Sequence, residues 1–243
     1  MLFTQLVATT SYSRVYRSDD GKCAVKELKP EMFRYYDAER RALSALAESK
    51  HPNVVALVGT FGANEQLYIA TEWLDSTLEH RLSQPDVNLA VVTQQLLVGV
   101  RFLHDSGWVH HDIKMSNVMY AEQQCKIIDF GFSHRLRVDG RCWCNVGTPL
   151  YTAPEVYQGE YDSRLADVWS LGVLVYLVHT GVQPFPAALT LTEHIQIINT
   201  YKYNRELLLD KPGVLRLLEH MLVPVSRRQL LTSADDSTPA EVV

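Results

Sequence analysis

The stretch V-H-H-D-I-K-M-S-N-V, from Val109 to Val118, places two histidines, an aspartate, a lysine and an asparagine side by side. These residue types suit a metal site, a buried polar cluster or a loop that carries chemistry. Consecutive side chains on a strand or loop point in different directions, so His110, His111 and Asp112 would seldom converge on one ion. Asp112, Lys114 and Asn117 instead offer a base, a cation and a neutral oxygen donor. That combination favours a loop that carries chemistry.

Four further motifs frame this stretch in a fixed order. Ala24-Val25-Lys26 ends a strand candidate upstream, and Asp129-Phe130-Gly131 follows an apolar strand candidate downstream. The order resembles the protein kinase family, whose catalytic loop H-R-D-x-x-x-x-N lies between a V-A-I-K strand and D-F-G. Gly147–Glu155 resembles the end of a kinase activation segment, and Tyr161–Val173 the buried helix after it. Asp112-Ile113-Lys114 is similar to the serine/threonine type of the family.

The resemblance implies an α+β, two-lobed protein kinase fold, and the residue patterns agree with it. We expect a small β-rich N-lobe with one helix over residues 1–75, a mainly helical C-lobe over 76–232 and a polar tail over 233–243. Apolar spacing indicates strands within 3–30 and at 54–57, 67–71, 118–120 and 125–128, with an irregular stretch at 131–160. It indicates helices at 31–48, 87–105, 165–180, 192–200 and 214–222.

Composition narrows the class of protein. The chain has 243 residues, is 47% hydrophobic and carries a net charge of −5, which is ordinary for a globular protein. The basic residues are spread out, so we expect no nucleic-acid partner. We also expect no membrane span and no signal peptide, and hence an intracellular protein, cytoplasmic or nuclear, that acts as a monomer. The four cysteines, which form no secreted-type pattern, are expected to be free thiols.

The resemblance also assigns the chemistry. It implies ATP and Mg²⁺ as cofactors and a protein substrate whose serine or threonine hydroxyl accepts the γ-phosphate. Asp112 would accept or orient the hydroxyl proton, and Lys114 would neutralise charge on the transferred group. Lys26 would reach the α- and β-phosphates, held by Glu39. Thr148 would bridge Asp112 and Lys114 through its hydroxyl.

The metal and nucleotide sites follow from the same resemblance. Asn117 and Asp129 would bind Mg²⁺, which prefers oxygen ligands. The adenine would lie against a hinge at residues 72–75, with Thr71 guarding the inner pocket. Besides Lys26, the residues expected around the nucleotide are Ala8, Thr10, Ser13, Val15, Ala24, Glu72, Leu74 and Met119.

Three residues have structural roles by resemblance. Asp167, a carboxylate in an apolar helix, is expected to accept hydrogen bonds from the backbone of the catalytic loop, since a buried charge needs such partners. Arg228 would pair with Glu155. His110 is expected to pack inward between the lobes. Its partners in that stack would be Leu43, Leu57 and Phe130.

The glycine-rich loop of the family is absent. The pattern G-x-G-x-x-G-x-V falls on residues 8–15, where no glycine occurs, and Tyr12 would occupy the tip of the hairpin. Glycine allows close approach of the backbone to phosphates and lets the loop flex. Because Ala8, Thr10 and Ser13 are small, we expect a stiffer loop with weaker ATP binding rather than a loop that cannot bind.

The region that many kinases regulate by phosphorylation also differs. His111 replaces an arginine that grips a phosphorylated residue in the family, and Cys144 takes the position of the acceptor threonine. The sequence therefore predicts activity without phosphorylation at that position. Cys142-Trp143-Cys144, with His134 nearby, is half of a zinc site, and no fourth ligand is evident from the sequence. A redox role is the alternative.

Three functions compete at this point. An active serine/threonine kinase needs Lys26, Glu39, Asp112, Asn117 and Asp129, and all five are present. A pseudokinase, acting as a nucleotide-binding or scaffolding module, is favoured by the missing glycines. A small-molecule phosphotransferase of related fold agrees poorly with Gly147–Glu155, which resembles a platform for protein substrates.

Overall fold

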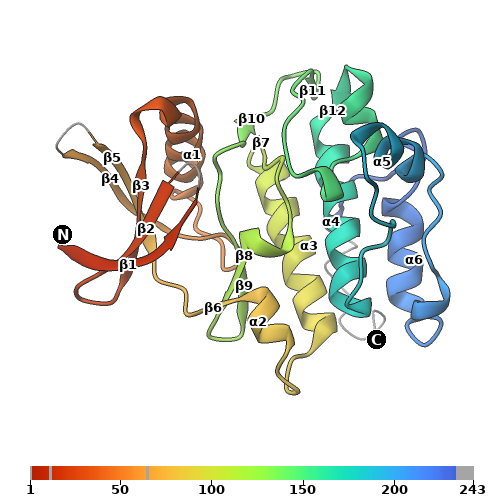
Figure 1. Cartoon of the computed structure of the whole chain (residues 1–243), viewed down its shortest axis with the longest axis horizontal. Helices are drawn as coiled ribbons and strands as arrows, with labels where there is room; N and C mark the ends of the chain where they lie inside the picture. The colour runs from red at the N-terminus through yellow and green to blue at the C-terminus, as the bar shows by residue number, and fades with distance from the viewer. Residues whose placement is uncertain (1, 11–12, 64–65, 234–243) are drawn as a thin grey trace.

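The computed structural model describes residues 2–10, 13–63 and 66–233, arranged as a sheet-rich part and a helical part (Figure 1). A five-stranded antiparallel sheet with the order β1-β2-β3-β5-β4 forms the first part. Its strands are β1 (Phe3–Thr9), β2 (Ser13–Ser18), β3 (Cys23–Leu28), β4 (Leu57–Ala63) and β5 (Gln66–Glu72). The predicted α+β, two-lobed architecture is confirmed.

The two faces of this sheet differ because side chains alternate along each strand. One face carries a separate apolar cluster that includes the buried residues Cys23, Val25 and Tyr68. The opposite face of β3 carries Ala24 and Lys26. The turn between β2 and β3 contains Gly21 at φ 74°, a left-handed conformation that glycine adopts without strain, as the Asp-Gly pair predicts.

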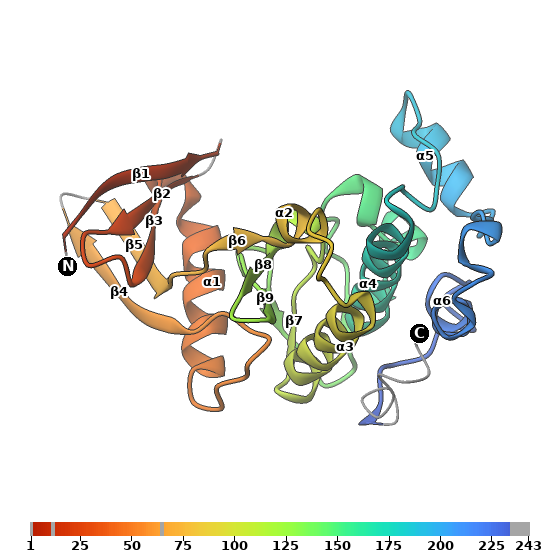
Figure 2. The ribbon, with the colours of Figure 1, turned by 90° about the horizontal axis from the view of Figure 1, so that it is seen from below.

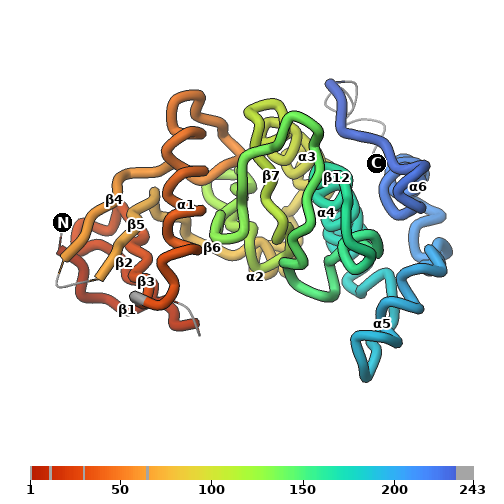
Figure 3. Tube along the Cα trace, turned by 90° about the horizontal axis from the view of Figure 1, so that it is seen from above, coloured from red at the N-terminus to blue at the C-terminus, as the bar shows by residue number. Residues whose placement is uncertain are grey.

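Helix α1 (Phe33–Leu46) follows a short 3₁₀ turn, η1 (Pro30–Met32), and packs beside the sheet (Figure 3). Its buried side chains, Tyr36, Glu39, Ala42, Leu43 and Leu46, recur at helical spacing. The strand predicted at 54–57 was wrong. Val54 forms only an isolated parallel bridge with Ile127, and the strand β4 begins at Leu57, because the backbone at this point pairs across to the other lobe.

Side chains cap the N-termini of the two long helices in the second part. Asn88 caps α3 (Leu89–Asp105) by accepting from the backbone N–H groups of Ala90 and Val91, and Asp162 caps α4 (Ser163–Thr180). Helix α4 is buried nearly all round, as its apolar sequence predicts. The remaining helices are α2 (Leu78–Leu82), which the sequence patterns did not reveal, α5 (Leu191–Ile198) and α6 (Pro212–Met221). Figure 2 shows α5 at the far edge of the molecule from the sheet.

Short paired strands hold in place the loops that join these helices. The strands β6 (Ser76–Thr77), β8 (Val118–Ala121) and β9 (Gln124–Ile127) form one small sheet. The pairs β7 (Trp108–Val109) with β10 (His134–Arg135), and β11 (Arg141–Cys142) with β12 (Tyr161–Asp162), form two more. Between these strands, residues 131–160 are largely irregular, as predicted, apart from 3₁₀ turns at η3 (Pro149–Tyr151) and η4 (Pro154–Gln158).

One sequence expectation, that of four free thiols, is contradicted by the structure. The prediction of four free thiols was wrong for Cys142 and Cys144, which the structure joins in a disulfide, because their two-residue spacing holds the Cα atoms 5.6 Å apart. Cys23 and Cys125 are free and buried. Tyr12 and nearly all of the polar tail lie outside the described residues.

The pairing of Arg228 with Glu155 is confirmed. The guanidinium contacts both carboxylate oxygens and also donates to the carbonyl of Leu165 at 3.0 Å and to that of Val223 at 2.9 Å. Both charged side chains are almost fully buried. Removing one partner of such a pair leaves a buried charge unpaired, so the contact fixes how the segment around Arg228 packs against η4 and α4.

Candidate active site

Lys26, Glu39 and Asp129 form one ion-pair group between the sheet, α1 and the loop after β9. The Nζ atom of Lys26 lies 2.7 Å from Oε2 of Glu39 and 2.8 Å from Oδ1 of Asp129. Glu39 is buried, whereas the side chain of Asp129 is 44% exposed. The arrangement holds the ammonium at the edge of a surface that a ligand can reach.

The charges of this group depend on one another. Burial disfavours the Lys26 ammonium, but the carboxylates of Glu39 and Asp129 outweigh it and raise the pKa of Lys26. Burial would raise the pKa of Asp129, yet the neighbouring Lys26 lowers it. Burial raises the pKa of Glu39, against the opposing effect of Lys26. Lys26 therefore stays a cation while it holds Asp129 as an anion.

Asp112, Lys114 and Thr148 form a closed triangle of hydrogen bonds. The Thr148 hydroxyl donates to Oδ1 of Asp112 at 2.7 Å and accepts from Nζ of Lys114 at 2.8 Å. Lys114 also lies 2.7 Å from Oδ2 of Asp112. The triangle orients the Asp112 carboxylate and joins the loop at 109–118 to residue 148.

Asn117 completes the surroundings of Asp112 and offers an oxygen for a cation. Its Nδ2 atom donates to the carbonyl oxygen of Asp112 at 2.9 Å and to Oδ2 at 3.0 Å. Because Nδ2 makes these contacts, Oδ1 retains its lone pairs. The Asn117 carbonyl accepts the N–H of Ile128 at 3.0 Å, which ties it to the residue before Asp129. The amide oxygen of Asn117 and the partly exposed carboxylate of Asp129 are ligand types that fit Mg²⁺.

Asp167 accepts hydrogen bonds from the backbone of the loop at 109–118, as predicted. Its carboxylate accepts the backbone N–H groups of His110 and His111, each at 2.8 Å, and contacts Nε2 of His104 at 3.0 Å. Burial would raise the pKa of Asp167, but His104 and the neighbouring histidines lower it. The sequence patterns missed His104, which lies on α3 and meets Asp167 only through tertiary packing.

His110 packs inward, as predicted. It is fully buried, and its ring meets that of Phe130 edge-on at a centroid distance of 4.9 Å. Nδ1 accepts the N–H of Asp112 at 3.2 Å, so Nε2 carries the proton and donates to the carbonyl of Ile128 at 3.0 Å. Leu43 and Phe130 are buried in the main apolar core, and Leu57 packs against it.

Three backbone conformations at the site lie in the left-handed region. His111 has φ 66° and Asp129 has φ 62°, values that side chains other than glycine rarely adopt. Gly147 has φ 110°. Such conformations persist only where surrounding contacts hold them, and here they cluster where the two loops meet.

Two of the residues expected around the adenine, Val15 and Ala24, share one face of the sheet. Val15 pairs with Lys26 across β2 and β3, and Ala24 pairs with Thr71 across β3 and β5. Cross-strand partners point to the same side, so these side chains face the same way as the Lys26 ammonium. Met119 lies on β8, in the other part of the molecule, and its partner across the ladder is Lys126.

The hinge contains an ion pair that the sequence did not reveal. The Glu72 carboxylate lies 2.7 Å from Nζ of Lys126 and accepts the N–H of Ala56 at 2.8 Å. The backbone N–H of Glu72 donates to the carbonyl of Ala56 at 3.0 Å, so this N–H group is already paired. Leu74 is buried beside it.

The turn between β1 and β2 is closed by hydroxyl groups. Oγ1 of Thr10 accepts the N–H of Ser13 at 3.0 Å and lies 3.1 Å from Oγ of Ser13. The N–H of Thr10 donates to the carbonyl of Ser13 at 2.8 Å. Ala8 lies beside this turn and pairs with Val15. Thr10 and Ser13, which stand at two of the three glycine positions of the family, are therefore joined through their side chains.

Comparison with known proteins agrees with this geometry. A family model described as the protein kinase domain matches residues 8–228, nearly the whole described chain. The chain belongs to the protein kinase family. The resemblance stated from the motifs is thereby confirmed, and the two parts of the molecule are the lobes of a kinase fold.

Several curated kinases are similar to this kinase chain. CBL-interacting protein kinase 31 of Oryza sativa subsp. japonica is 30% identical over 85% of the chain, which covers 48% of that protein. CBL-interacting serine/threonine-protein kinase 9 of Arabidopsis thaliana is 34% identical over 72%, covering 42% of it. Calcium-dependent protein kinase 5 of Plasmodium berghei (strain Anka) is 27% identical over 72%, covering 33%. The chain thus spans less than half the length of these relatives.

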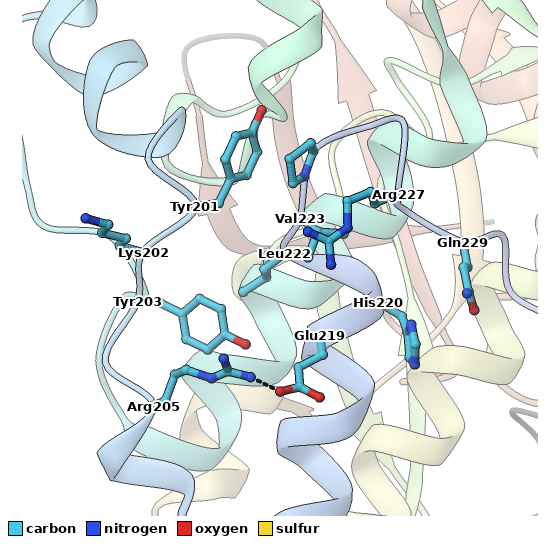
Figure 4. Close-up of a pocket in the computed structure, with 11 residues that line it drawn as sticks. Tyr201, Lys202, Tyr203, Arg205, Glu219, His220, Leu222, Val223, Arg227 and Gln229 are labelled. Atoms are coloured by element: carbon cyan, nitrogen blue, oxygen red, sulfur yellow. Dashed lines mark hydrogen bonds and ion pairs between the residues drawn. The ribbon is translucent and has the colours of Figure 1, made fainter.

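A separate pocket lies in the C-lobe of the kinase (Figure 4). It has a volume of about 1020 Å³ and is lined from Tyr201 to Gln229, so it shares no residue with the site above. Arg205 and Glu219 form an ion pair across it.

None of the helices in the described residues has the length and apolar character that a membrane crossing requires.

Proposed function

We propose that this chain is an active serine/threonine protein kinase that transfers the γ-phosphoryl group of Mg²⁺-ATP to hydroxyl groups of protein substrates. The observation that carries the proposal is the triangle of Asp112, Lys114 and Thr148 beside the ion-pair group of Lys26, Glu39 and Asp129. Phosphoryl transfer depends mainly on positioning and on neutralising charge, and these two groups supply both.

Each residue has a defined task in this proposal. ATP supplies the phosphoryl group, and Mg²⁺, held by Asn117 and Asp129, would offset phosphate charge. Lys26 binds phosphate oxygens while Glu39 fixes its position. Asp112 takes the proton from the substrate hydroxyl. Val15 and Ala24 on the sheet face, Met119 on β8 and the backbone of Glu72 and Leu74 would hold the adenine.

Lys114 and Thr148 set the orientation of the base. Lys114 offers its ammonium to the transferred phosphoryl group, and its contacts with Asp112 and Thr148 keep it in place. Because the Thr148 hydroxyl links both side chains, the activation segment must lie in its present position for the base to be oriented. The relative from Arabidopsis thaliana, which is named a serine/threonine-protein kinase, supports the choice of a hydroxyl acceptor.

We further propose that activity does not require phosphorylation of the activation segment. His111 occupies the position where the family has a gripping arginine, and Cys144 occupies the acceptor position. Burial lowers the pKa of His111 to about 4, so at neutral pH it carries no charge with which to hold a phosphate. The segment is instead held by the contacts of Gly147, Thr148 and Tyr161.

Transfer of labelled γ-phosphate to mixed serine and threonine peptides tests the activity. Asp112→Asn, which removes the base with little change of shape, should lower kcat by about 10²–10⁴-fold. Phosphatase treatment of the wild-type protein should leave its rate unchanged, whereas a large loss would contradict independence from phosphorylation. Absence of transfer over a range of Mg²⁺, ATP and peptides would favour the pseudokinase, which the missing glycines suggest.

A further inference from the structure

A cluster of metal-binding side chains lies outside the proposed phosphoryl-transfer site. Ligand atoms of His111, His134 and Cys142 all lie within 4.8 Å of one another, and Cys144 is joined to Cys142 by the disulfide. We propose that these four residues form a tetrahedral zinc site once the Cys142–Cys144 bond is reduced. The sequence alone indicated His134, Cys142 and Cys144 as ligands. It did not indicate His111, which belongs to the motif at 109–118, distant in the chain.

Two small sheets bring the four residues together (Figure 1). In the β7–β10 pair, His134 lies opposite Val109, two residues before His111. In the β11–β12 pair, Cys142 lies opposite Tyr161. The rings of His111 and His134 have centroids 4.4 Å apart and planes tilted by 60°. The cluster is therefore built on paired backbone rather than on a free loop.

Tyr161 fixes which nitrogen of His111 is available. Its hydroxyl donates to the carbonyl of Cys144 at 2.6 Å, and its oxygen lies 3.3 Å from Nδ1 of His111. A phenol has one proton, so Nδ1 of His111 must carry the hydrogen and donate to the tyrosine oxygen. Nε2 is left with a lone pair, and within the described residues this buried atom has no hydrogen-bond partner.

A buried acceptor without a hydrogen-bond partner destabilises the fold, and a metal ion bound to Nε2 of His111 would supply the missing partner. Histidines that bind metals usually donate their other ring N–H to an oxygen, as His111 does to Tyr161. His134 has similar support, because it makes a hydrogen bond with the backbone at Phe132. Both histidines thus have the outer contact that holds a metal-binding ring in orientation.

The donor set and its charge suit zinc. Two thiolates and two neutral imidazoles neutralise Zn²⁺, and an S₂N₂ set is typical of tetrahedral structural sites. The N–H of Cys144 lies 3.1 Å from Sγ of Cys142, a contact that stabilises a thiolate. Zn–N bonds of about 2.0 Å and Zn–S bonds of about 2.3 Å require the ligand atoms of His111, His134 and Cys142 to draw together by roughly 1 Å, while the two sulfurs, no longer bonded to each other, move apart.

Reduction must come first, and the step balances with a dithiol reductant. The dithiol gives two electrons and two protons to the Cys142–Cys144 bond. The S–S bond breaks, two protein thiols form, and the reductant closes into its own disulfide. Zn²⁺ then replaces the proton of each thiol, and two protons leave to solvent. Oxidised protein lacks the two thiolates and would not bind.

A bound ion would connect three segments of the kinase. His111 belongs to the catalytic loop, His134 to β10, and both cysteines to the activation segment. If the proposed kinase activity holds, the ion would order the segment that carries Thr148, in place of the phosphate contact that this chain lacks. Metal binding itself is independent of that activity and can be measured without it.

Cobalt binding to the full chain tests the site. Protein reduced with a dithiol and desalted without oxygen is titrated with Co²⁺ in excess Mg²⁺, and the thiolate-to-cobalt charge-transfer band is recorded. Mg²⁺ occupies oxygen ligands such as Asp129, and these give no such band. We expect a band that saturates at one ion per chain and is displaced by Zn²⁺. The same protein with its disulfide intact is the matched control and should show no band.

Variants separate the ligands from a general loss of structure. Cys144→Ser should abolish the band, and Tyr161→Phe should weaken cobalt binding by about 10–100-fold, as expected for loss of an outer contact. Zn²⁺ should raise the melting temperature of reduced wild-type protein but not of Cys144→Ser. Reduced protein that melts cooperatively yet shows no band, or a band that survives His134→Gln unchanged, would overturn the proposal.

Discussion

Gly147 approaches the catalytic loop so closely that a Cβ atom added at this position would stand 2.7 Å from the carbonyl oxygen of His111. Its φ of 110° is also a conformation that side chains rarely adopt. Gly147 lies next to Thr148, so the contact determines where the Thr148 hydroxyl meets Asp112. The distance between these two loops is thus set by the absence of a side chain.

Replacing Gly147 by alanine should therefore separate the two loops. The strained φ alone costs about 1–3 kcal/mol, and the clash with backbone leaves no flexible atom to move aside. We expect kcat to fall by more than tenfold, together with a lower melting temperature. Gly181→Ala is the matched control, because Gly181 has φ 73° at the end of α4 but open space around its Cβ position. Equal kcat values for the two variants would contradict this account.

Thr148→Val tests the hydroxyl that links Asp112 and Lys114. Valine keeps the shape of threonine but can neither donate nor accept, and a hydrogen bond to a charged group contributes about 1.5–3 kcal/mol. The variant should lose roughly 10–100-fold in kcat, while the KM for ATP stays near the wild-type value. Thr148→Ser, which restores the hydroxyl, should recover most of the rate. A slow serine variant would show that the methyl group, not the hydroxyl, matters.

His179 should make the fold sensitive to mild acid. It is buried in α4, and burial lowers its pKa to about 4 from a usual 6.5. Oγ1 of Thr93 donates to the carbonyl of Leu89, so it accepts from Nε2 of His179 at 2.8 Å. The other nitrogen, Nδ1, is buried without a partner among the described residues. Protonation would place an N–H there with no acceptor.

The lowered pKa of His179 determines the direction in which stability changes with pH. Between pH 6.5 and 4 the unfolded chain binds a proton at His179 that the folded chain refuses, so stability falls as the pH falls through this range. The loss should be on the order of 3 kcal/mol at pH 4. Denaturant unfolding of His179→Gln should show a shallower dependence on pH, whereas the exposed His80→Gln should match the wild type. If the unfolding free energy of His179→Gln depends on pH as steeply as that of the wild type, other groups cause the acid sensitivity.

Sequence motifs predicted the candidate site because each motif is local. The loop from Asp112 to Asn117 and the group around Asp129 carry their spacing in the chain itself, and the family resemblance supplied the distant partners Lys26 and Glu39. The secondary structure followed from apolar spacing in the long helices. It failed at 54–57, where the backbone of Val54 pairs with Ile127 in the other lobe.

Contacts that arise only from tertiary packing could not be predicted from sequence motifs. His104 lies on an amphipathic helix with no motif, yet it meets Asp167 at 3.0 Å. Lys126 on β9 lies 2.7 Å from the carboxylate of Glu72 on β5, a contact between segments far apart in the sequence. The approach of His111 to Cys142 is of the same kind, because two separate strand pairs create it.

The turn between β1 and β2 offers the last test. Thr10 and Ser13 close it through hydroxyl contacts of 3.0 and 3.1 Å, at positions where the family has glycine. Thr10→Gly with Ser13→Gly removes both hydroxyls and returns the freedom that lets backbone N–H groups approach phosphates. We expect a lower KM for ATP with kcat little changed, measured by steady-state kinetics at fixed peptide. Thr9→Gly, on exposed β1 outside the closing contacts, serves as the control for glycine in this hairpin. If the double variant keeps the wild-type KM, the hydroxyl closure does not limit nucleotide binding.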